Sequence, residues 1–167
     1  MSIEYDSIVA SVTQFLGNYA DFTVSAYPYG RMKHYDTPVV AVSIEEAEST
    51  PSGAGDYLGI FHDAETGERE LYGRYLEVTL GLHIYSPDTE NHGANGCQRT
   101  FGQIVGAFSE STLPVKVKSL QCGDTEFDSV TRMYHCKALA KCRCFMTAEI
   151  REDGQFTDYI LKGVMIK

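Results

Sequence analysis

Cysteine and histidine supply the side chains of this chain best suited to nucleophilic or metal-binding chemistry, and there are five of each. Cys136, Cys142 and Cys144 fall in one stretch beside His135. Structural zinc sites typically use paired C-x2-C spacing, whereas these cysteines follow C-x5-C and C-x-C spacing. In a strand the three thiols share one side with intervening apolar residues, and His135 faces away. Since free cysteine behaves as a small buried hydrophobe, we expect reduced core thiols that hold no metal.

Cys97 has two interpretations. It lies near the expected beginning of a helix, where the helix dipole lowers a thiol pKa, and His92, five residues earlier, is the candidate base. A small cysteine hydrolase that uses Cys97 and His92 is therefore one hypothesis. In the other, Cys97 is in phase with Phe101, Ile104 and Phe108 and belongs to the apolar stripe of the helix. Because the local signatures of cysteine hydrolases are absent, we predict an ordinary thiol and no enzymatic activity.

The remaining motifs give no support to a cofactor. The glycine-containing loop 91–96 has neither a G-K-S/T ending nor a G-x-G-x-x-G pattern, so it predicts no phosphate or dinucleotide site. His34, His62 and His83 fall in different expected elements, and we expect them at surface or partner positions.

Composition limits the partners and the compartment. Lys plus Arg is 14 and Asp plus Glu is 23, so the net charge is 14 − 23 = −9. Nucleic-acid binding needs clustered basic residues, so we expect no sequence-specific nucleic-acid contact. The beginning of the chain lacks a signal-peptide pattern, and its apolar runs are too short to cross a membrane. We therefore expect a cytoplasmic protein with free thiols.

The elements that position these residues form one domain, residues 1–167. Hydrophobic periodicity predicts a helix over 2–16 and another from Cys97 to Phe108. The predicted strands cover 22–27, 38–45, 57–62, 70–85, 115–121 and 127–150, the last as one long strand or two, and a short strand over 159–165 fits the pattern. A flexible loop is expected at 46–56, and a hairpin tip at 63–68. Because helices and strands do not alternate, the fold class is α+β: a mostly antiparallel or mixed sheet with both helices packed on one face.

The strand over 70–85 suggests a contact surface. Its apolar residues alternate with a side that is polar, rich in tyrosine and poor in charge, which is typical of an interface rather than of a solvated face. Alternating lysines in the strand that begins at 115 could add charge complementarity. The expected contact residues are Arg74, Tyr75, Thr79, His83, Lys116 and Lys118.

The order of elements resembles the tail-terminator and tail-completion proteins of tailed bacteriophages. Four stretches carry the resemblance, which spans roughly Ile3 to Ile150: SIEYDSIVASVTQFLG, LYGRYLEVTLGLHIYSP, GCQRTFGQIVGAFSE and LPVKVKSLQCGDTEFDSVTRMYHCKALAKCRCFMTAEI. The resemblance implies an α/β sandwich that forms a hexameric ring, caps the tail tube and meets the head connector. It implies no active site and no cofactor. The partners would be other copies of the chain, the tail-tube protein and the head-connector protein. Assembly would take place in the bacterial host cytoplasm, and the protein would then stay in the virion.

The thiol cluster and the acidic hairpin depart from this pattern. They leave open whether the tail is contractile, and whether the chain is instead a tail-tube or neck protein of the same particle. A ligand-binding module with an acidic surface is a further alternative of another class.

Overall fold

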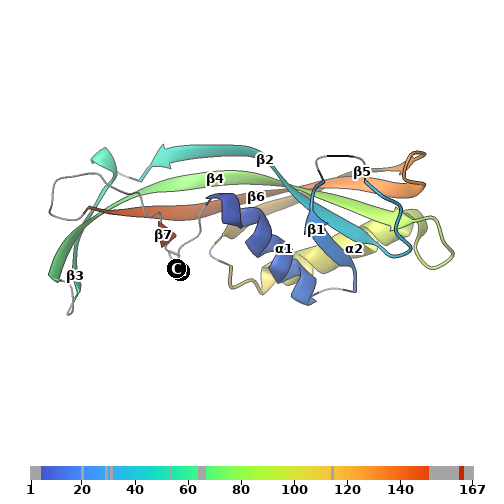
Figure 1. The fold of residues 1–167 in the computed structure, drawn as a ribbon, viewed down its shortest axis with the longest axis horizontal. Coiled ribbons are helices and arrows are strands. Elements are labelled where there is room, and N and C mark those ends of the chain that lie inside the picture. Colours follow the sequence, from blue (N-terminus) through green and yellow to red (C-terminus); the bar gives the residue numbers. More distant parts are fainter. Residues whose placement is uncertain are drawn as a thin grey trace.

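The computed structural model describes residues 5–19, 21–28, 30, 32–52, 54–63, 67–113, 115–150 and 162–163 (Figure 1). The helices are α1 (Ile8–Tyr19, preceded by the short η1, Tyr5–Ser7), η2 (Ala54–Asp56) and α2 (Gly93–Ser109). The strands are β1 (Thr23–Ala26), β2 (Val39–Pro51), β3 (Tyr57–Asp63), β4 (Gly67–Pro87), β5 (Lys116–Asp128), β6 (Met133–Ile150) and β7 (Lys162–Gly163).

The strands form one sheet in the order β1-β2-β4-β6-β5, with β3 also paired to β4 and β7 to β6. β1 and β2 run parallel, and all other pairs are antiparallel. Both α1 and α2 pack on one face of this sheet (Figure 1). The predicted α+β class, with two helices on one face of a mixed sheet, is confirmed.

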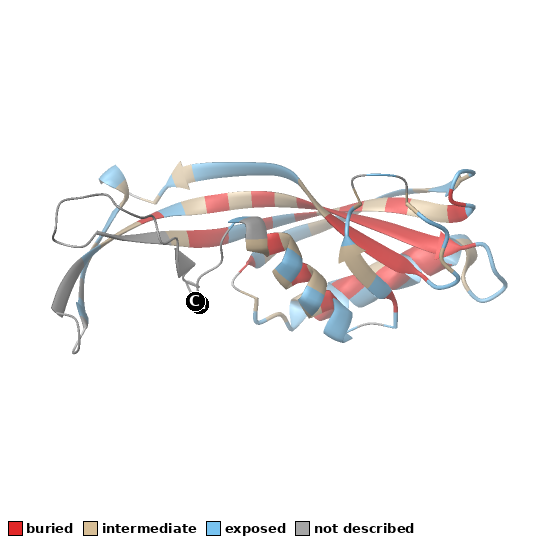
Figure 2. Ribbon diagram, viewed as in Figure 1, coloured by how far each residue is buried: buried red, intermediate tan, exposed pale blue. Residues whose placement is uncertain are grey.

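Strand alternation builds the core. Leu76, Val78, Leu80, Leu82 and Ile84 of β4 all face the helices and are at most 6% exposed. They pack with apolar residues of α1 and α2, and with the alternate residues of β6. A fully buried side chain of this size contributes roughly 1.5–3 kcal/mol. Figure 2 shows buried residues concentrated where the helices cover the sheet.

The sheet continues beyond the helices as an arm, which consists of β3 and the adjoining parts of β2, β4 and β6 (Figure 1). β4 pairs with β6 without a register shift from Glu70↔Ile150 to Pro87↔Met133. Both strands, together with β2 and β3, extend past the helical layer (Figure 1). Neither α1 nor α2 covers this part of the sheet, and the described arm residues are mostly intermediate or exposed (Figure 2). No helix among the described residues is long and apolar enough to cross a membrane.

The predicted loop 46–56 is largely strand. Residues 46–51 continue β2 and pair with residues 79–74 of β4, after a register shift between Ile44 and Glu46. The small and polar composition suggested a loop, but pairing with the long β4 overrides this local preference. Only Ala54–Asp56 forms a helical turn. The predicted hairpin of β3 and β4 is confirmed, while 64–66 of its tip lie outside the described residues.

The stretch predicted over 127–150 is two elements, because a turn separates β5 from β6. Asp128 holds this turn: its carboxylate accepts hydrogen bonds from the Val130 amide at 2.9 Å and from the Thr131 hydroxyl at 2.8 Å. Arg132 completes the turn with φ of 57° and donates its amide to the Asp128 carbonyl. An Asp at a turn start is a known signal that strand periodicity alone obscures.

Further boundaries differ from the expectation. α1 covers Ile8–Tyr19 rather than 2–16 and follows η1. α2 begins at Gly93 rather than at Cys97, and β5 continues to Asp128, past the predicted end at 121. Of the strand expected over 159–165, the described part is Lys162–Gly163.

Replacing Asp128 with Ala should lower the free energy of unfolding by about 1–2 kcal/mol, because two hydrogen bonds of the turn are lost. Urea unfolding of the variant beside wild type measures this change. Ser129→Ala, at the exposed neighbouring position, is the matched control and should leave the midpoint nearly unchanged. Equal effects of the two substitutions would contradict the role assigned to Asp128.

Candidate interaction surface

The face of the sheet opposite α1 and α2, here called the outer face, carries the odd-numbered residues of β4 from Tyr75 to Tyr85 and those of β6 from His135 to Phe145. Tyr75, Thr79 and His83, predicted as contact residues, belong to it. Lys116 is in register with Arg143, and Lys118 bonds to Glu77, so both predicted lysines join the same face.

Arg74 is the exception among the six predicted contact residues. Successive residues of a strand point to opposite sides, so Arg74 and Tyr75 cannot share a face. Arg74 is in register with Met146, on the helix side of the sheet. Its Nε lies 3.7 Å from a carboxylate oxygen of Asp56. A contact through Arg74 therefore stays a prediction, and it would use the side of the sheet opposite Tyr75.

An aromatic patch of Leu58, Tyr75 and Phe145 lies on the outer face where the arm begins. The Tyr75 and Phe145 rings meet edge to face, 5.2 Å between centroids. Gly73 makes room for them, since a Cβ there would lie 2.7 Å from Leu58 and closer still to the Phe145 ring. The Arg143 guanidinium lies 5.0 Å from the Tyr75 centroid, close enough for a cation–π interaction. Tyr, Phe and Arg are the residue types enriched at interfaces.

A basic strip, made of Lys116, Lys118, Lys141 and Arg143, lies beside the aromatic patch. One carboxylate, that of Glu77, accepts hydrogen bonds from Lys118 at 2.8 Å and from Arg143 Nε at 2.9 Å. These bonds lower its pKa from 4.5 to about 2. The strip thus carries four positive charges, two of which pair with Glu77.

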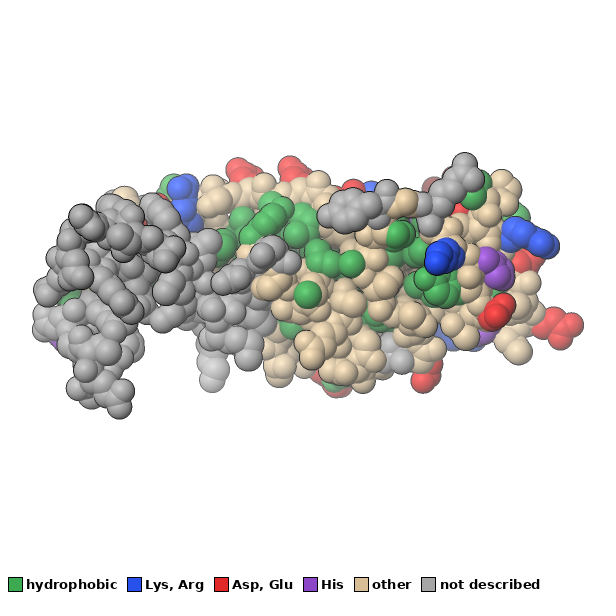
Figure 3. All heavy atoms as spheres, viewed as in Figure 1, with side chains coloured by type: hydrophobic (Ala, Val, Ile, Leu, Met, Phe, Trp, Pro, Cys, Tyr) green, Lys and Arg blue, Asp and Glu red, His purple; other side chains and the backbone are tan. Residues whose placement is uncertain are grey.

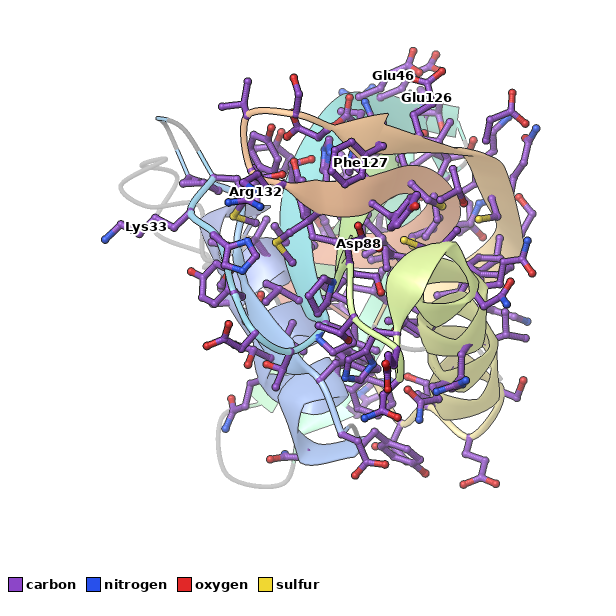
Figure 4. All side chains as sticks on the ribbon, turned by 90° about the vertical axis from the view of Figure 1, so that its right-hand side faces the viewer. Lys33, Glu46, Asp88, Glu126, Phe127 and Arg132 are labelled. Carbon is purple, nitrogen blue, oxygen red and sulfur yellow. The ribbon has the colours of Figure 1, made fainter. Side chains whose placement is uncertain are left out.

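An acidic edge, made of Glu46 and Glu48, lies on β2. Both residues are exposed and point to the outer face, since they are in register with Thr79 and Glu77. Figure 3 shows acidic side chains along the edge that β2 forms, and Figure 4 shows Glu46 projecting away from the helices. The register of β1 with β2 ends at Val42, so among the described strands none pairs with the outer side of β2 beyond that residue.

A histidine pair on the outer face was not found from the sequence. His83 Nδ1 lies 3.3 Å from His135 Nε2, and the two rings are within 9° of parallel. Tyr27 packs on His83 with centroids 4.2 Å apart, and Tyr85 stacks on His135 at 4.5 Å. Because Tyr85 pairs directly with His135, His83 becomes its diagonal neighbour. The sequence shows both histidines but not the register that joins them.

Charge and burial determine the protonation of this pair. Burial lowers the pKa of both imidazoles below the usual 6.5, so at neutral pH they are uncharged and one donates to the other. The Lys137 ammonium, 2.6 Å from the Glu45 carboxylate, is the main cause of lowering the Glu45 pKa to about 2. Glu45 also lies 3.5 Å from His83 Nε2, which opposes the effect of burial without overcoming it.

Cys97 is a core residue. α2 begins at Gly93, four residues before Cys97, so the thiol lies beyond the first turn, where the dipole acts most strongly. Its side chain is fully buried, with Sγ 3.5 Å from the Tyr134 carbonyl and 3.8 Å from that of Ile84. Burial raises its pKa to about 11. These features disfavour the thiolate that a hydrolase with a His92 base would need.

The thiols of β6 lie as the alternation predicts. Cys136, Cys142 and Cys144 are free, face the helices and are at most 3% exposed. Within the described part of the chain, no group of three or more His, Cys, Asp or Glu residues is placed to hold a metal ion.

Stability should fall in two steps on acidification. In the unfolded chain histidine is protonated near pH 6.5, whereas in the folded chain burial opposes protonation of His83 and His135. Stability therefore falls as pH drops below 6.5 toward the lowered pKa of these two residues. A second loss follows from 4.5 toward 2, where Glu45 and Glu77 lose their ion pairs.

Urea unfolding from about pH 2 to about pH 8 measures both steps. The double variant His83→Gln, His135→Gln should lose the first step and keep the second. His92→Gln, at a residue whose side chain makes no capping hydrogen bond to α2, is the control and should keep both. An unchanged first step in the double variant would contradict the assignment.

Comparisons with known proteins give no further assignment for this surface. A scan against protein-family models finds none that matches the chain, and a search of curated proteins finds no match. The geometry of the outer face and of the arm is therefore the basis for inferring a function.

Proposed function

We propose that this chain is a structural subunit that assembles with copies of itself into a ring, and that it serves as a tail terminator. In that role the ring caps the tail tube of a phage or phage-tail-like particle and offers a surface to the head connector. The single observation that carries the assembly role is a sheet whose outer face and arm neither α1 nor α2 covers. They bear Tyr75 packed on the buried Phe145 ring, and charges of opposite sign on separate strands.

The arm is the first support. Tyr57, Leu58 and Ile60 of β3 are 43%, 42% and 52% exposed, and α1 and α2 do not reach them. By its pairing with β4, Tyr57 and Ile60 lie on the helix side, whereas Leu58 lies on the outer face beside Gly73. Exposed apolar side chains on both sides of a projecting element are typical of a protein contact. A neighbouring copy packed on the arm would remove these side chains from water.

Charge is the second support. The acidic edge lies at the β2 side of the sheet, and the basic strip lies on β5 and β6 at the other side. Contact between the acidic edge of one copy and the basic strip of the next joins opposite charges. The resulting pair still has one free acidic edge and one free basic strip, so further copies can add at both ends. Such a head-to-tail contact closes into a ring when the rotation between copies allows.

The occupant that fits both surfaces is a second copy of this chain, because each carries what the other lacks. The sixfold number follows from the resemblance to tail terminators and not from this geometry. A tail-tube or neck protein would form a similar ring. This alternative function therefore uses the same interface between copies and differs in the proteins that contact the two faces of the ring.

Charge reversal tests the interface. The double variant Glu46→Lys, Glu48→Lys should abolish ring formation, because it places like charges against the basic strip. Light scattering over a concentration series and negative-stain imaging measure the outcome. Glu90→Lys, in the exposed loop before α2, changes charge away from the interface and is the control.

A second pair of substitutions makes the test specific. Lys116→Glu, Lys141→Glu should also prevent assembly alone, yet restore it when mixed with the Glu46→Lys, Glu48→Lys protein. In an alternating ring the lysines of one variant meet the glutamates of the other, and the unchanged acidic edge meets the unchanged basic strip. Wild-type chain that remains monomeric at high concentration, and that does not bind tail tubes, would contradict the proposal. Rings that bind the tube end favour the terminator, whereas rings that stack into tubes favour the tail-tube alternative.

A further inference from the structure

We propose that Cys122 of β5 and Cys136 of β6 are a redox site that forms a reversible cross-strand disulfide with oxidants of the low-molecular-weight disulfide class, such as oxidised glutathione. The proposal does not depend on the ring. It rests on two thiols whose contact the strand register produces and which the assembly surface does not use.

The geometry places the two sulfurs in contact. Their Sγ atoms lie 2.9 Å apart, whereas a disulfide bond is about 2.05 Å long, so closure needs a movement of roughly 1 Å. A register shift lies between Cys122 and Thr125, and Thr125 is the residue in register with Cys136. This irregularity brings Cys122 toward a thiol that lies diagonally across the ladder.

The other thiols lack this arrangement. Cys142 and Cys144 lie on one strand and direct their sulfurs to the carbonyls of Ala140 and Leu76, at 3.5 Å and 3.7 Å. Cys97 directs its thiol to the carbonyls of Ile84 and Tyr134. The sulfur–sulfur contact found among the described residues is therefore specific to Cys122 and Cys136.

Exposure assigns the two thiols different roles. Cys122 is partly exposed at the rim of the core, whereas Cys136 is fully buried, so an oxidant meets Cys122 first. Burial and the contact with Cys122 raise the pKa of the Cys136 thiol to about 12. Cys136 therefore stays protonated until the oxidant has reacted with Cys122. Cys122 is thus the attacking thiol, and Cys136 is the resolving thiol.

The reaction balances with oxidised glutathione as the oxidant. The Cys122 thiolate attacks one glutathione sulfur, which breaks the glutathione disulfide and releases one glutathione thiolate. That thiolate takes the Cys136 proton, and the Cys136 sulfur attacks Cys122 Sγ. The protein disulfide forms as the second glutathione thiolate leaves and takes up the proton released by Cys122. Two protein thiols are oxidised, and one oxidised glutathione is reduced to two glutathione molecules.

The bond would tie the edge strand β5 covalently to β6. It would close a loop that contains the turn after Asp128 and the exposed Phe127 and Val130, which are 50% and 63% exposed. This turn lies at the end of the molecule opposite the arm (Figure 1), and Figure 4 shows Phe127 at that end. Oxidation would therefore stiffen the exposed apolar tip while leaving the arm free.

Peptide mapping gives a direct test, because each of the five cysteines lies in a separate tryptic peptide. The reduced full-length chain is incubated with oxidised and reduced glutathione at graded ratios, blocked with iodoacetamide and digested. We expect a linked pair of peptides 119–132 and 133–137, which disappears after treatment with a dithiol reductant. The oxidised chain should show a rise in Tm of about 5 °C or more, since the bond restricts the unfolded chain.

Two variants control the experiment. Cys122→Ser should give no linked peptides and no rise in Tm, while Cys144→Ala should still give both. A stable glutathione adduct on Cys122 without closure, a disulfide that includes Cys97, or no oxidation at any ratio would each overturn the proposal.

Discussion

The antiparallel ladder between β4 and β6 is the interaction on which the rest of the structure depends. It runs without a register shift over the full length of β6, so every residue of one strand has a fixed partner on the other. This ladder places the core leucines of β4 beside the thiols of β6 on the helix side. It also places Tyr75 beside Phe145 and Tyr85 beside His135 on the outer face. A slip of one residue would send each of these sets to the wrong side.

The same ladder explains why the two ends of the molecule differ in how far their side chains are buried. At one end α1 and α2 bury the apolar side of the sheet. At the other end the strands continue as the arm, and their backbone pairing continues without a helical layer. Pairing satisfies the backbone hydrogen-bonding groups of the arm but buries little side-chain area. A neighbouring subunit that packs on the arm would bury these side chains.

Local patterns in the sequence were enough to predict the fold class and much of the core. Alternation in 70–85 and around Cys136 gave the correct buried sides, because alternation is a property of a single strand. The sequence failed where the answer depends on pairing between strands. Residues 46–51 look like a loop until β4 pairs with them, and the histidine pair and the Cys122–Cys136 contact follow from registers that no local pattern contains. Alternation alone places Arg74 on the side opposite Tyr75, so a contact through Arg74 would be separate from the outer face.

The central claim is that a neighbouring copy covers the open edges and the outer face. Hydrogen exchange measured on dilute and concentrated protein tests it most directly, because the outer amides of β2 beyond Val42 and those of β5 exchange with solvent unless another chain protects them. If a neighbouring copy covers these edges, protection should increase with concentration at 43–51 and 116–121, with unchanged exchange in the β4 core strand. Equal exchange at these edges in dilute protein and in assembled particles would contradict it.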